Sequence, residues 1–304
     1  MRNPDSLDSE RRAFTRRWVC AVAMGAVAAC GPLLAGCGGD ASNDDAPAGA
    51  GSTTAATSES EALDGVVEID GGRRLYVRCT GDGSPTIVLE GGDQDTSDSY
   101  RFAEARLADV TRTCVYDRAN LGRSDPATGP RGLSELVEDL ARLLEAAEIP
   151  PPYVLVGTSG GGYITAGYAS VHPDHVAGMV FIDVAAPFRN PPPEIVEETD
   201  PSHPDNIEQR DYLQVEKDAW AARRRIGAIP VTVVSVDYTP EAEAAAKWPS
   251  ERRGMQRNAD DQRGWLVLSP RARQLVVHTG HAVEEDDPEL VIDTILDVVK
   301  AART

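Results

Sequence analysis

The chain has 304 residues, of which 41% are hydrophobic and 26% are charged, so its composition excludes a collagen, a coiled coil and a multi-pass membrane protein. Its 49 acidic residues outnumber its 30 basic residues, and a formal net charge of −19 argues against a nucleic-acid partner. The same charge is repelled by an anionic membrane surface, so any attachment to a membrane needs a dedicated anchor.

The first 36 residues have the order of a bacterial export signal. Four arginines between positions 11 and 17 precede an apolar run over residues 18–36. The segment that begins with Arg11-Arg12 resembles a twin-arginine signal, and Leu34-Ala35-Gly36-Cys37 resembles a lipobox. These resemblances imply that residues 1–36 are removed and that a lipid on Cys37 anchors the chain outside the cytoplasm. The alternative is an uncleaved single-span anchor, against which the many glycines of the segment argue.

Residues 37–64 are predicted to be a flexible linker. They are rich in Gly, Ala, Ser, Thr and acidic residues and have no apolar periodicity, so they cannot bury enough surface to fold. The remaining residues, 65–304, are predicted to form one domain.

In this domain, short apolar and β-branched runs alternate with amphipathic stretches. The runs predict strands at residues 66–69, 74–79, 86–90, 113–116, 153–156, 178–182, 231–236 and 274–277. Most are continuously apolar, as in a parallel sheet covered on both faces. An apolar stripe at helical spacing predicts a helix over residues 133–144, and Asp287-Pro288 predicts the start of the last helix. The alternation predicts a doubly wound α/β fold.

Residues 185–229 interrupt this alternation. They are polar and include three successive prolines, and a helix is predicted over residues 206–225. We expect an insertion that forms a small lid over one end of the sheet. It has few large apolar residues, which favours a small soluble substrate over a lipid droplet.

The segment Gly157-Thr158-Ser159-Gly160-Gly161 lies between a predicted strand and a helix-like stretch and matches the pattern G-x-S-x-G. A turn this sharp strains the backbone of the serine and needs small neighbours, because strand and helix approach closely. The Ser159 hydroxyl then projects at a helix N-terminus, where the Gly160 N–H can stabilise an oxyanion. The alternative, a phosphate-binding loop, lacks its lysine.

Three further segments extend this motif into a resemblance to the serine α/β-hydrolase family. Residues 86–92 resemble the turn after the family's third strand, residues 115–125 the loop after its fourth strand, and residues 279–288 its histidine loop. The resemblance covers residues 66–302. It implies an α/β-hydrolase fold, with a mostly parallel eight-stranded sheet, helices on both faces and a small lid insertion.

The resemblance also implies the second oxyanion donor. The family often has His-Gly in the turn where this chain has Glu90-Gly91, so Gly92 is expected to supply the second N–H. Asp117 and Arg118 are expected to brace their loop by hydrogen bonds rather than to act in catalysis.

The serine needs a base, and histidine suits this role at neutral pH. His281 lies in the loop after the last predicted strand, at the edge where the family keeps its base. His278, which ends that strand, is the alternative. His278 and His281 could also form a metal site together, but no supporting Cys or acidic ligand set accompanies them. No metal and no cofactor are therefore predicted.

The acid that orients the histidine has two main candidates. Asp183 follows the sixth predicted strand, and Asp237 follows the seventh; the family uses either place. Asp183 is the first candidate for the acid, Asp237 is the alternative, and Glu241 is a third candidate.

In this fold the second and fourth strands can be neighbours, so the resemblance implies that Cys79 and Cys114 can meet. An exported chain reaches an oxidising compartment, which favours a disulfide between them over two buried thiols.

These features predict an exported serine hydrolase that cleaves an ester or amide of a small molecule through an acyl-enzyme. A proline-iminopeptidase-like peptidase is a close alternative, because it differs only in the leaving group. A lipoprotein that binds a ligand on the same fold without catalysis is the second alternative. The sequence does not indicate an oligomeric state.

Overall fold

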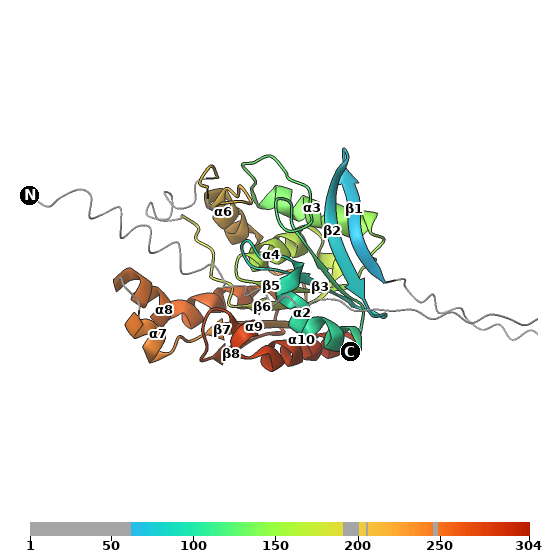
Figure 1. Ribbon diagram of the computed structural model, residues 1–304. Helices are drawn as coiled ribbons and strands as arrows, with labels where there is room; N and C mark the ends of the chain where they lie inside the picture. Colours follow the sequence, from blue (N-terminus) through green and yellow to red (C-terminus); the bar gives the residue numbers. More distant parts are fainter. Residues whose placement is uncertain (1–61, 191–200, 205, 246–248) are drawn as a thin grey trace, which may run out of the picture. The chain divides into compact units, whose positions relative to one another are not determined.

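The computed structural model of the chain describes residues 62–190, 201–204, 206–245 and 249–304 (Figure 1). The predicted signal segment, the lipidation site Cys37 and nearly all of the predicted linker lie outside these residues. None of the helices in the described ranges is long and apolar enough to cross a membrane.

Eight strands form one sheet with the order β1-β2-β4-β3-β5-β6-β7-β8. The strands are β1 (Leu63–Asp70), β2 (Arg73–Thr80), β3 (Thr86–Glu90), β4 (Thr113–Tyr116), β5 (Tyr153–Thr158), β6 (Val176–Ile182), β7 (Val231–Val236) and β8 (Ala272–Val277). The pairs β1–β2 and β2–β4 are antiparallel and all other neighbours are parallel. This confirms the predicted sheet. The strand β1 begins inside the predicted linker, because Leu63 and Asp64 already pair with β2.

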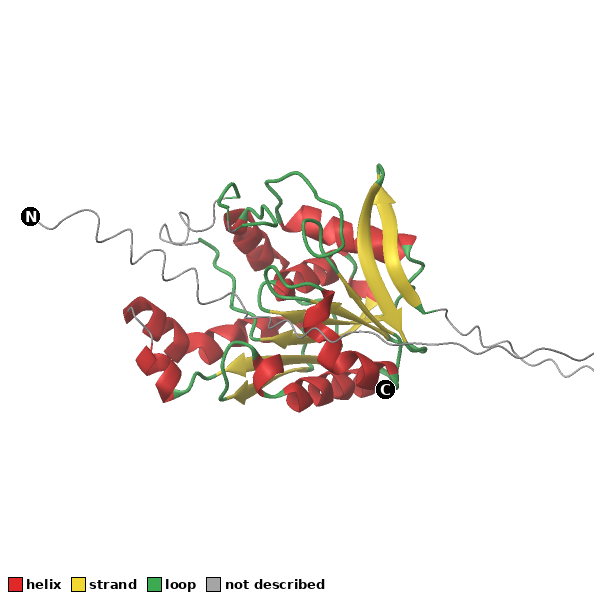
Figure 2. Ribbon diagram, in the orientation of Figure 1, coloured by secondary structure: helices red, strands yellow, loops and turns green. Residues whose placement is uncertain are grey.

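Helices cover both faces of the sheet (Figure 2). The helical segments are η2 (Ser97–Tyr100), α2 (Arg101–Ala108), α3 (Leu133–Ala146), α4 (Gly161–Val171), η3 (Pro173–His175), α6 (Tyr212–Ala222), α7 (Pro240–Ala245), α8 (Pro249–Gln262), η4 (Arg263–Leu268), α9 (Val283–Asp286) and α10 (Pro288–Ala302). Successive side chains of a strand point to opposite faces. In β5, Leu155 packs with α3 and α4, whereas Val154 and Val156 pack with α2 and α10. A strand buried on both faces must be apolar throughout, which explains the continuous runs in the sequence.

Two of the predicted helices start or pack as expected. The apolar stripe of α3 is buried in the core; its members are Leu133, Leu136, Val137, Leu140, Leu143 and Leu144. Asp287 caps α10 by accepting a hydrogen bond of 3.1 Å from the Leu290 N–H, and Pro288 is the first helical residue.

The helix predicted over residues 206–225 is shorter than expected. The Asn206 side chain bonds both the N–H (3.0 Å) and the C=O (2.9 Å) of Arg210, and this local turn replaces the first helical turn. Asp211 then caps α6 by accepting from the Gln214 N–H at 3.0 Å. The described residues 206–211 therefore form a turn before the helix begins.

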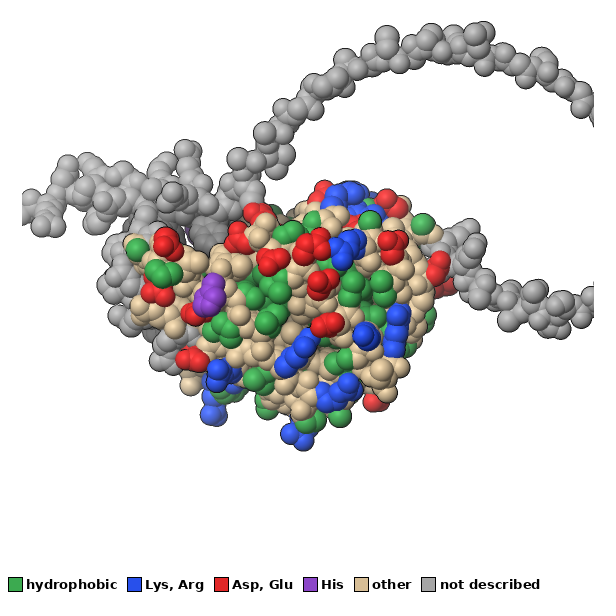
Figure 3. All heavy atoms as spheres, turned by 90° about the horizontal axis from the view of Figure 1, so that it is seen from below, with side chains coloured by type: hydrophobic (Ala, Val, Ile, Leu, Met, Phe, Trp, Pro, Cys, Tyr) green, Lys and Arg blue, Asp and Glu red, His purple; other side chains and the backbone are tan. Residues whose placement is uncertain are grey.

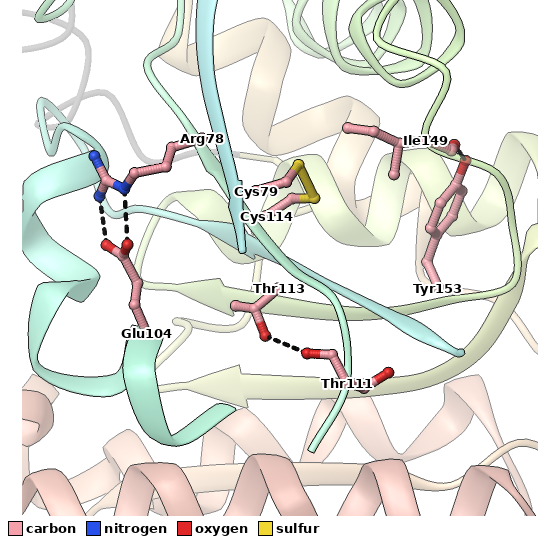
Figure 4. Close-up of a disulfide and its surroundings, with 8 residues drawn as sticks. All are labelled: Arg78, Cys79, Glu104, Thr111, Thr113, Cys114, Ile149 and Tyr153. Carbon is pink, nitrogen blue, oxygen red and sulfur yellow. Dashed lines mark hydrogen bonds and ion pairs between the residues drawn. A yellow bond between two sulfur atoms is a disulfide. The ribbon is translucent and has the colours of Figure 1, made fainter. Parts of the chain in front are cut away.

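Cys79 of β2 and Cys114 of β4 are paired directly across the antiparallel strands and form a disulfide (Figure 4). Both residues are buried, and their bond joins positions 35 residues apart in the sequence. The predicted disulfide is confirmed.

Acidic and basic side chains are interspersed with apolar ones on the face of the molecule seen in Figure 3. On this face most acidic side chains lie in the upper half of the view and most basic side chains lie in the lower half.

Candidate active site

Ser159 stands at the turn from β5 into α4 with a φ of 47°, in the left-handed region that a non-glycine residue rarely adopts. Its N–H donates to the Ile182 carbonyl at 2.9 Å, which ties the turn to the end of β6. A Cβ at Gly157 would lie 2.6 Å from the Cα of Gly162, so strand and helix can meet at this distance only through glycines. The strained turn predicted from the sequence is present.

The structure brings Ser159, His281 and Asp183 together from three loops at the carboxyl edge of the sheet. The Ser159 Oγ lies 3.1 Å from His281 Nε2, and His281 Nδ1 lies 2.5 Å from Asp183 Oδ2. These loops follow β5, β6 and β8, whose parallel arrangement places their ends side by side. The three side chains form one hydrogen-bonded row.

Asp183 is held as a carboxylate by several donors. It is 3% exposed, and its Oδ1 accepts from the side-chain amides of Asn258 and Gln262, both at 2.7 Å. The Tyr238 hydroxyl donates to Oδ2 at 3.2 Å. Burial by itself raises the pKa of Asp183, but the bonds from His281, Gln262 and Asn258 outweigh it and lower that pKa below its ordinary value.

His281 gains basicity from this contact. The hydrogen bond to Asp183 raises the pKa of the imidazole above its ordinary value, and partial burial opposes this shift without cancelling it. With Nδ1 bonded to the carboxylate, the other ring nitrogen, Nε2, faces the Ser159 hydroxyl. The ring can therefore accept a proton from the serine.

The other candidates for base and acid lie together at a different place. Asp237 Oδ2 is 3.5 Å from His278 Nδ1, and both side chains are on the surface, at 47% and 71% exposure. Glu241 is exposed on α7. The structure thus places Asp183, rather than Asp237, against His281.

The two predicted oxyanion donors both lie next to the serine, but they differ in their partners. Gly160 is the N-cap residue of α4, and a Cβ there would overlap the carboxylate of Asp93. A Cβ at Gly92 would lie 3.4 Å from the Cβ of Ser159. The Gly92 N–H, however, already donates to Asp95 Oδ2 at 3.0 Å, a contact that the sequence analysis did not anticipate. Burial raises the pKa of Asp95.

Arg118 fixes the backbone of this oxyanion loop. It is 4% exposed, and it donates to the carbonyls of Gly91 (2.8 Å) and Gly92 (2.6 Å). It also pairs with Glu90 at 2.6 Å and with Glu208 at 2.7 Å. Arg118 braces a loop by hydrogen bonds as expected, but its side chain holds the loop beside Ser159 rather than its own loop. The contribution of Glu208 was missed, because nothing in the insertion sequence distinguishes it from a surface acid.

Asp117 also braces its surroundings. Its carboxylate accepts from the backbone N–H groups of Ser97 (2.6 Å) and Arg123 (2.8 Å). It therefore holds the loops on either side of β4 rather than facing the serine.

A cavity of about 260 Å³ opens onto this site. It is lined by Asp93, Ser159, Gly160, Tyr163, Asp183, Ala185, Arg210, Tyr212, Val215, Glu216, Tyr238, Asn258 and His281. Five of these residues, namely Ala185 and four at positions 210–216, belong to the predicted insertion, which therefore forms one wall of the cavity. A second depression, of about 550 Å³, lies elsewhere and is lined in part by His172 and His175. Within the described part of the chain, no group of three or more His, Cys, Asp or Glu side chains could hold a metal ion.

Comparisons with known proteins agree with this architecture. The family profile described as alpha/beta hydrolase fold matches residues 85–232. The Bacillus subtilis protein called "Uncharacterized protein YqjL" is 27% identical over 226 residues, which cover 73% of this chain and 86% of that protein.

Solved structures show the same fold at low identity. Est816, described as an N-acyl homoserine lactone degrading enzyme, is 19% identical with a TM-score of 0.58; the match covers 77% of this chain and 100% of the other. A thermophilic esterase from Thermogutta terrifontis is 22% identical with a TM-score of 0.52, covering 80% of this chain and 100% of the other. The fold class predicted from the sequence is confirmed.

Proposed function

We propose that this chain, which has the alpha/beta hydrolase fold, is a serine hydrolase that cleaves an ester or amide of a small molecule through an acyl-enzyme. The observation that carries the proposal is the hydrogen-bonded row from Ser159 through His281 to Asp183. Two structural neighbours are described as an esterase and a lactone-degrading enzyme, which supports an acyl substrate.

In the proposed reaction the Ser159 Oγ attacks the acyl carbonyl carbon, and His281 Nε2 takes the hydroxyl proton. The Nδ1–H of the imidazolium donates to Asp183, which stabilises the positive ring and fixes its orientation. The tetrahedral intermediate collapses as His281 returns the proton to the leaving oxygen or nitrogen. Water then attacks the acyl-enzyme by the same route, and the acid product is released.

The developing oxyanion is assigned to the N–H groups of Gly160 and Gly92. Because Asp95 Oδ2 accepts from the Gly92 N–H, the carbonyl oxygen of the substrate has to replace this carboxylate oxygen. Arg118 keeps the Gly91–Gly92 peptide in place during the exchange, because it holds the Gly91 carbonyl of the peptide unit that carries this N–H.

A small substrate is proposed because the cavity, at about 260 Å³, is near the lower limit of about 300–1,000 Å³ for ligand pockets. Its wall from the insertion carries the charged side chains Arg210 and Glu216, which do not suit a long acyl chain.

A fluorophosphonate probe tests this proposal, since it reacts only with an activated serine. We expect labelling of the folded wild type and none of Ser159→Ala. Folded wild type that stays unlabelled and hydrolyses no ester would support instead a protein that binds a ligand without catalysis.

We also propose that the chain is exported and anchored by a lipid on Cys37. The Cys79–Cys114 disulfide supports this, because such bonds persist in oxidising compartments. Expression in a bacterial host with labelled palmitate should label the wild type and not Cys37→Ser. Equal labelling of both would contradict the anchor.

A further inference from the structure

Resting on the proposed function, we propose that the active-site cavity selects substrates that carry a positively charged group, and that Glu216 of α6 binds that group. The proposal depends on how charge is distributed over the walls of the cavity.

Three carboxylates line the cavity, and two of them face a basic partner. Asp183 is bonded to His281, and Asp93 forms an ion pair with Arg210. Glu216 is the third carboxylate. Among the described residues, no cationic side chain pairs with it.

The two oxygens of Glu216 accept from neutral donors. The Tyr163 hydroxyl donates to Oε1 at 3.1 Å, and the Phe188 N–H donates to Oε2 at 2.7 Å. Each carboxylate oxygen can accept more than one hydrogen bond, so both can receive a further donor. Burial, strengthened by the nearby Asp93, raises the pKa of Glu216, so a cation bound beside it would stabilise the ionised carboxylate.

Arg210, the arginine of the cavity wall, does not offer its charge to a ligand. Besides its ion pair with Asp93, it donates to Glu208 at 3.0 Å. A substrate carboxylate would therefore have to displace a protein carboxylate, whereas a cation can add to Glu216 without displacing anything.

The aromatic lining is a separate observation that also favours a cation. Three tyrosines contribute to the wall, namely Tyr163, Tyr212 and Tyr238. The faces of such rings attract ammonium groups in a site from which water is largely excluded. Tyr163 also joins Glu216 to the helix that begins just after Ser159, so the charge lies close to the nucleophile.

Matched substrate pairs test the proposal. One pair is p-nitrophenyl aminohexanoate, with a terminal ammonium, and p-nitrophenyl heptanoate, in which a methyl group replaces it. The other pair is butyrylthiocholine and its uncharged dimethylbutyl analogue. The first pair carries the charge on the acyl side, and the second carries it on the leaving group.

We expect the wild type to prefer the charged member of at least one pair by about tenfold in kcat/KM, the size expected for a charge-assisted contact. Added salt should reduce this preference, because it screens the attraction. In Glu216→Gln the ratio should fall to within about twofold of one, since the amide offers the same shape without the charge. Asp218→Asn removes a carboxylate from the same helix outside the cavity and should keep the wild-type ratio.

Inhibition of the wild type provides a measurement that does not depend on a variant. Butylammonium should inhibit hydrolysis of the neutral ester competitively, and butanol at the same concentration should not. Turnover of the neutral esters without preference for a cation, or a preference that survives in folded Glu216→Gln, would overturn this inference and leave the proposed function standing. Failure of every substrate together with failure of fluorophosphonate labelling would overturn both.

Discussion

Replacement of the buried Arg118 by methionine should destabilise the fold strongly. Arg118 makes contacts of 2.6 Å to Glu90 and of 2.7 and 3.0 Å to the two oxygens of Glu208. Without it, Glu208 keeps its pair with Arg210, but Glu90 keeps only the hydroxyl of Tyr116 and stays buried. Removing one partner of a buried ion pair costs about 3–5 kcal/mol, so we expect Arg118→Met to lose that much free energy of unfolding near neutral pH.

The loss should depend on pH in a definite direction. Burial already raises the pKa of Glu90, and removal of Arg118 takes away the charge that opposes this shift. An acid whose pKa is raised in the folded state destabilises the fold at a pH where it must ionise. The deficit in unfolding free energy should therefore grow as the pH rises from about 5 to about 8.

Urea denaturation at both pH values measures this deficit. Arg101→Met is the matched control, because Arg101 pairs with Asp98 on the surface and should cost less than about 1 kcal/mol. Adding Glu90→Gln to Arg118→Met should recover part of the loss, since it removes the unpaired charge. A deficit below about 1 kcal/mol, or one that is equal at both pH values, would refute the reasoning.

Two further predictions concern the disulfide and the acid of the catalytic row. The double variant Cys79→Ala/Cys114→Ala should lose about 2–4 kcal/mol of unfolding free energy, since the disulfide closes a loop of 35 residues; a reductant should lower the stability of the wild type and leave the variant unchanged. In Asp183→Asn, the carboxylate that raises the pKa of His281 is absent, so the acidic limb of the kcat/KM profile should move to lower pH. A limb that stays in place would mean that another group sets the pKa of His281.

Much of this architecture could be predicted from the sequence, because the relevant signals are local. Continuous apolar runs mark strands buried on both faces, and the glycines around Ser159 mark a turn where strand and helix meet. The residues that depend on contacts distant in sequence could not be found in this way. Nothing local distinguishes Asp183 from Asp237, since both end an apolar strand. The tertiary structure separates them, because it brings His281, Asn258 and Gln262 to Asp183.

The oxyanion loop illustrates the same limit. Gly92 was predicted from the resemblance of residues 86–92 to the turn after the family's third strand, and it lies beside the serine. Its bond to Asp95 depends on the course of the loop, and the support that Arg118 receives from Glu208 joins residues 90 positions apart. Such contacts are set by tertiary structure and leave no periodic pattern in the sequence.

The central claim is that Ser159, His281 and Asp183 act as one catalytic unit. Its most direct test is p-nitrophenyl butyrate hydrolysis by residues 38–304, with Asp183→Asn compared with Asp237→Asn and with Ser159→Ala as the blank. We expect Asp183→Asn to lose about 10³–10⁴-fold in kcat, and Asp237→Asn to stay within about twofold of the wild type. Equal rates for the two aspartate variants, or full activity in Ser159→Ala, would contradict the account.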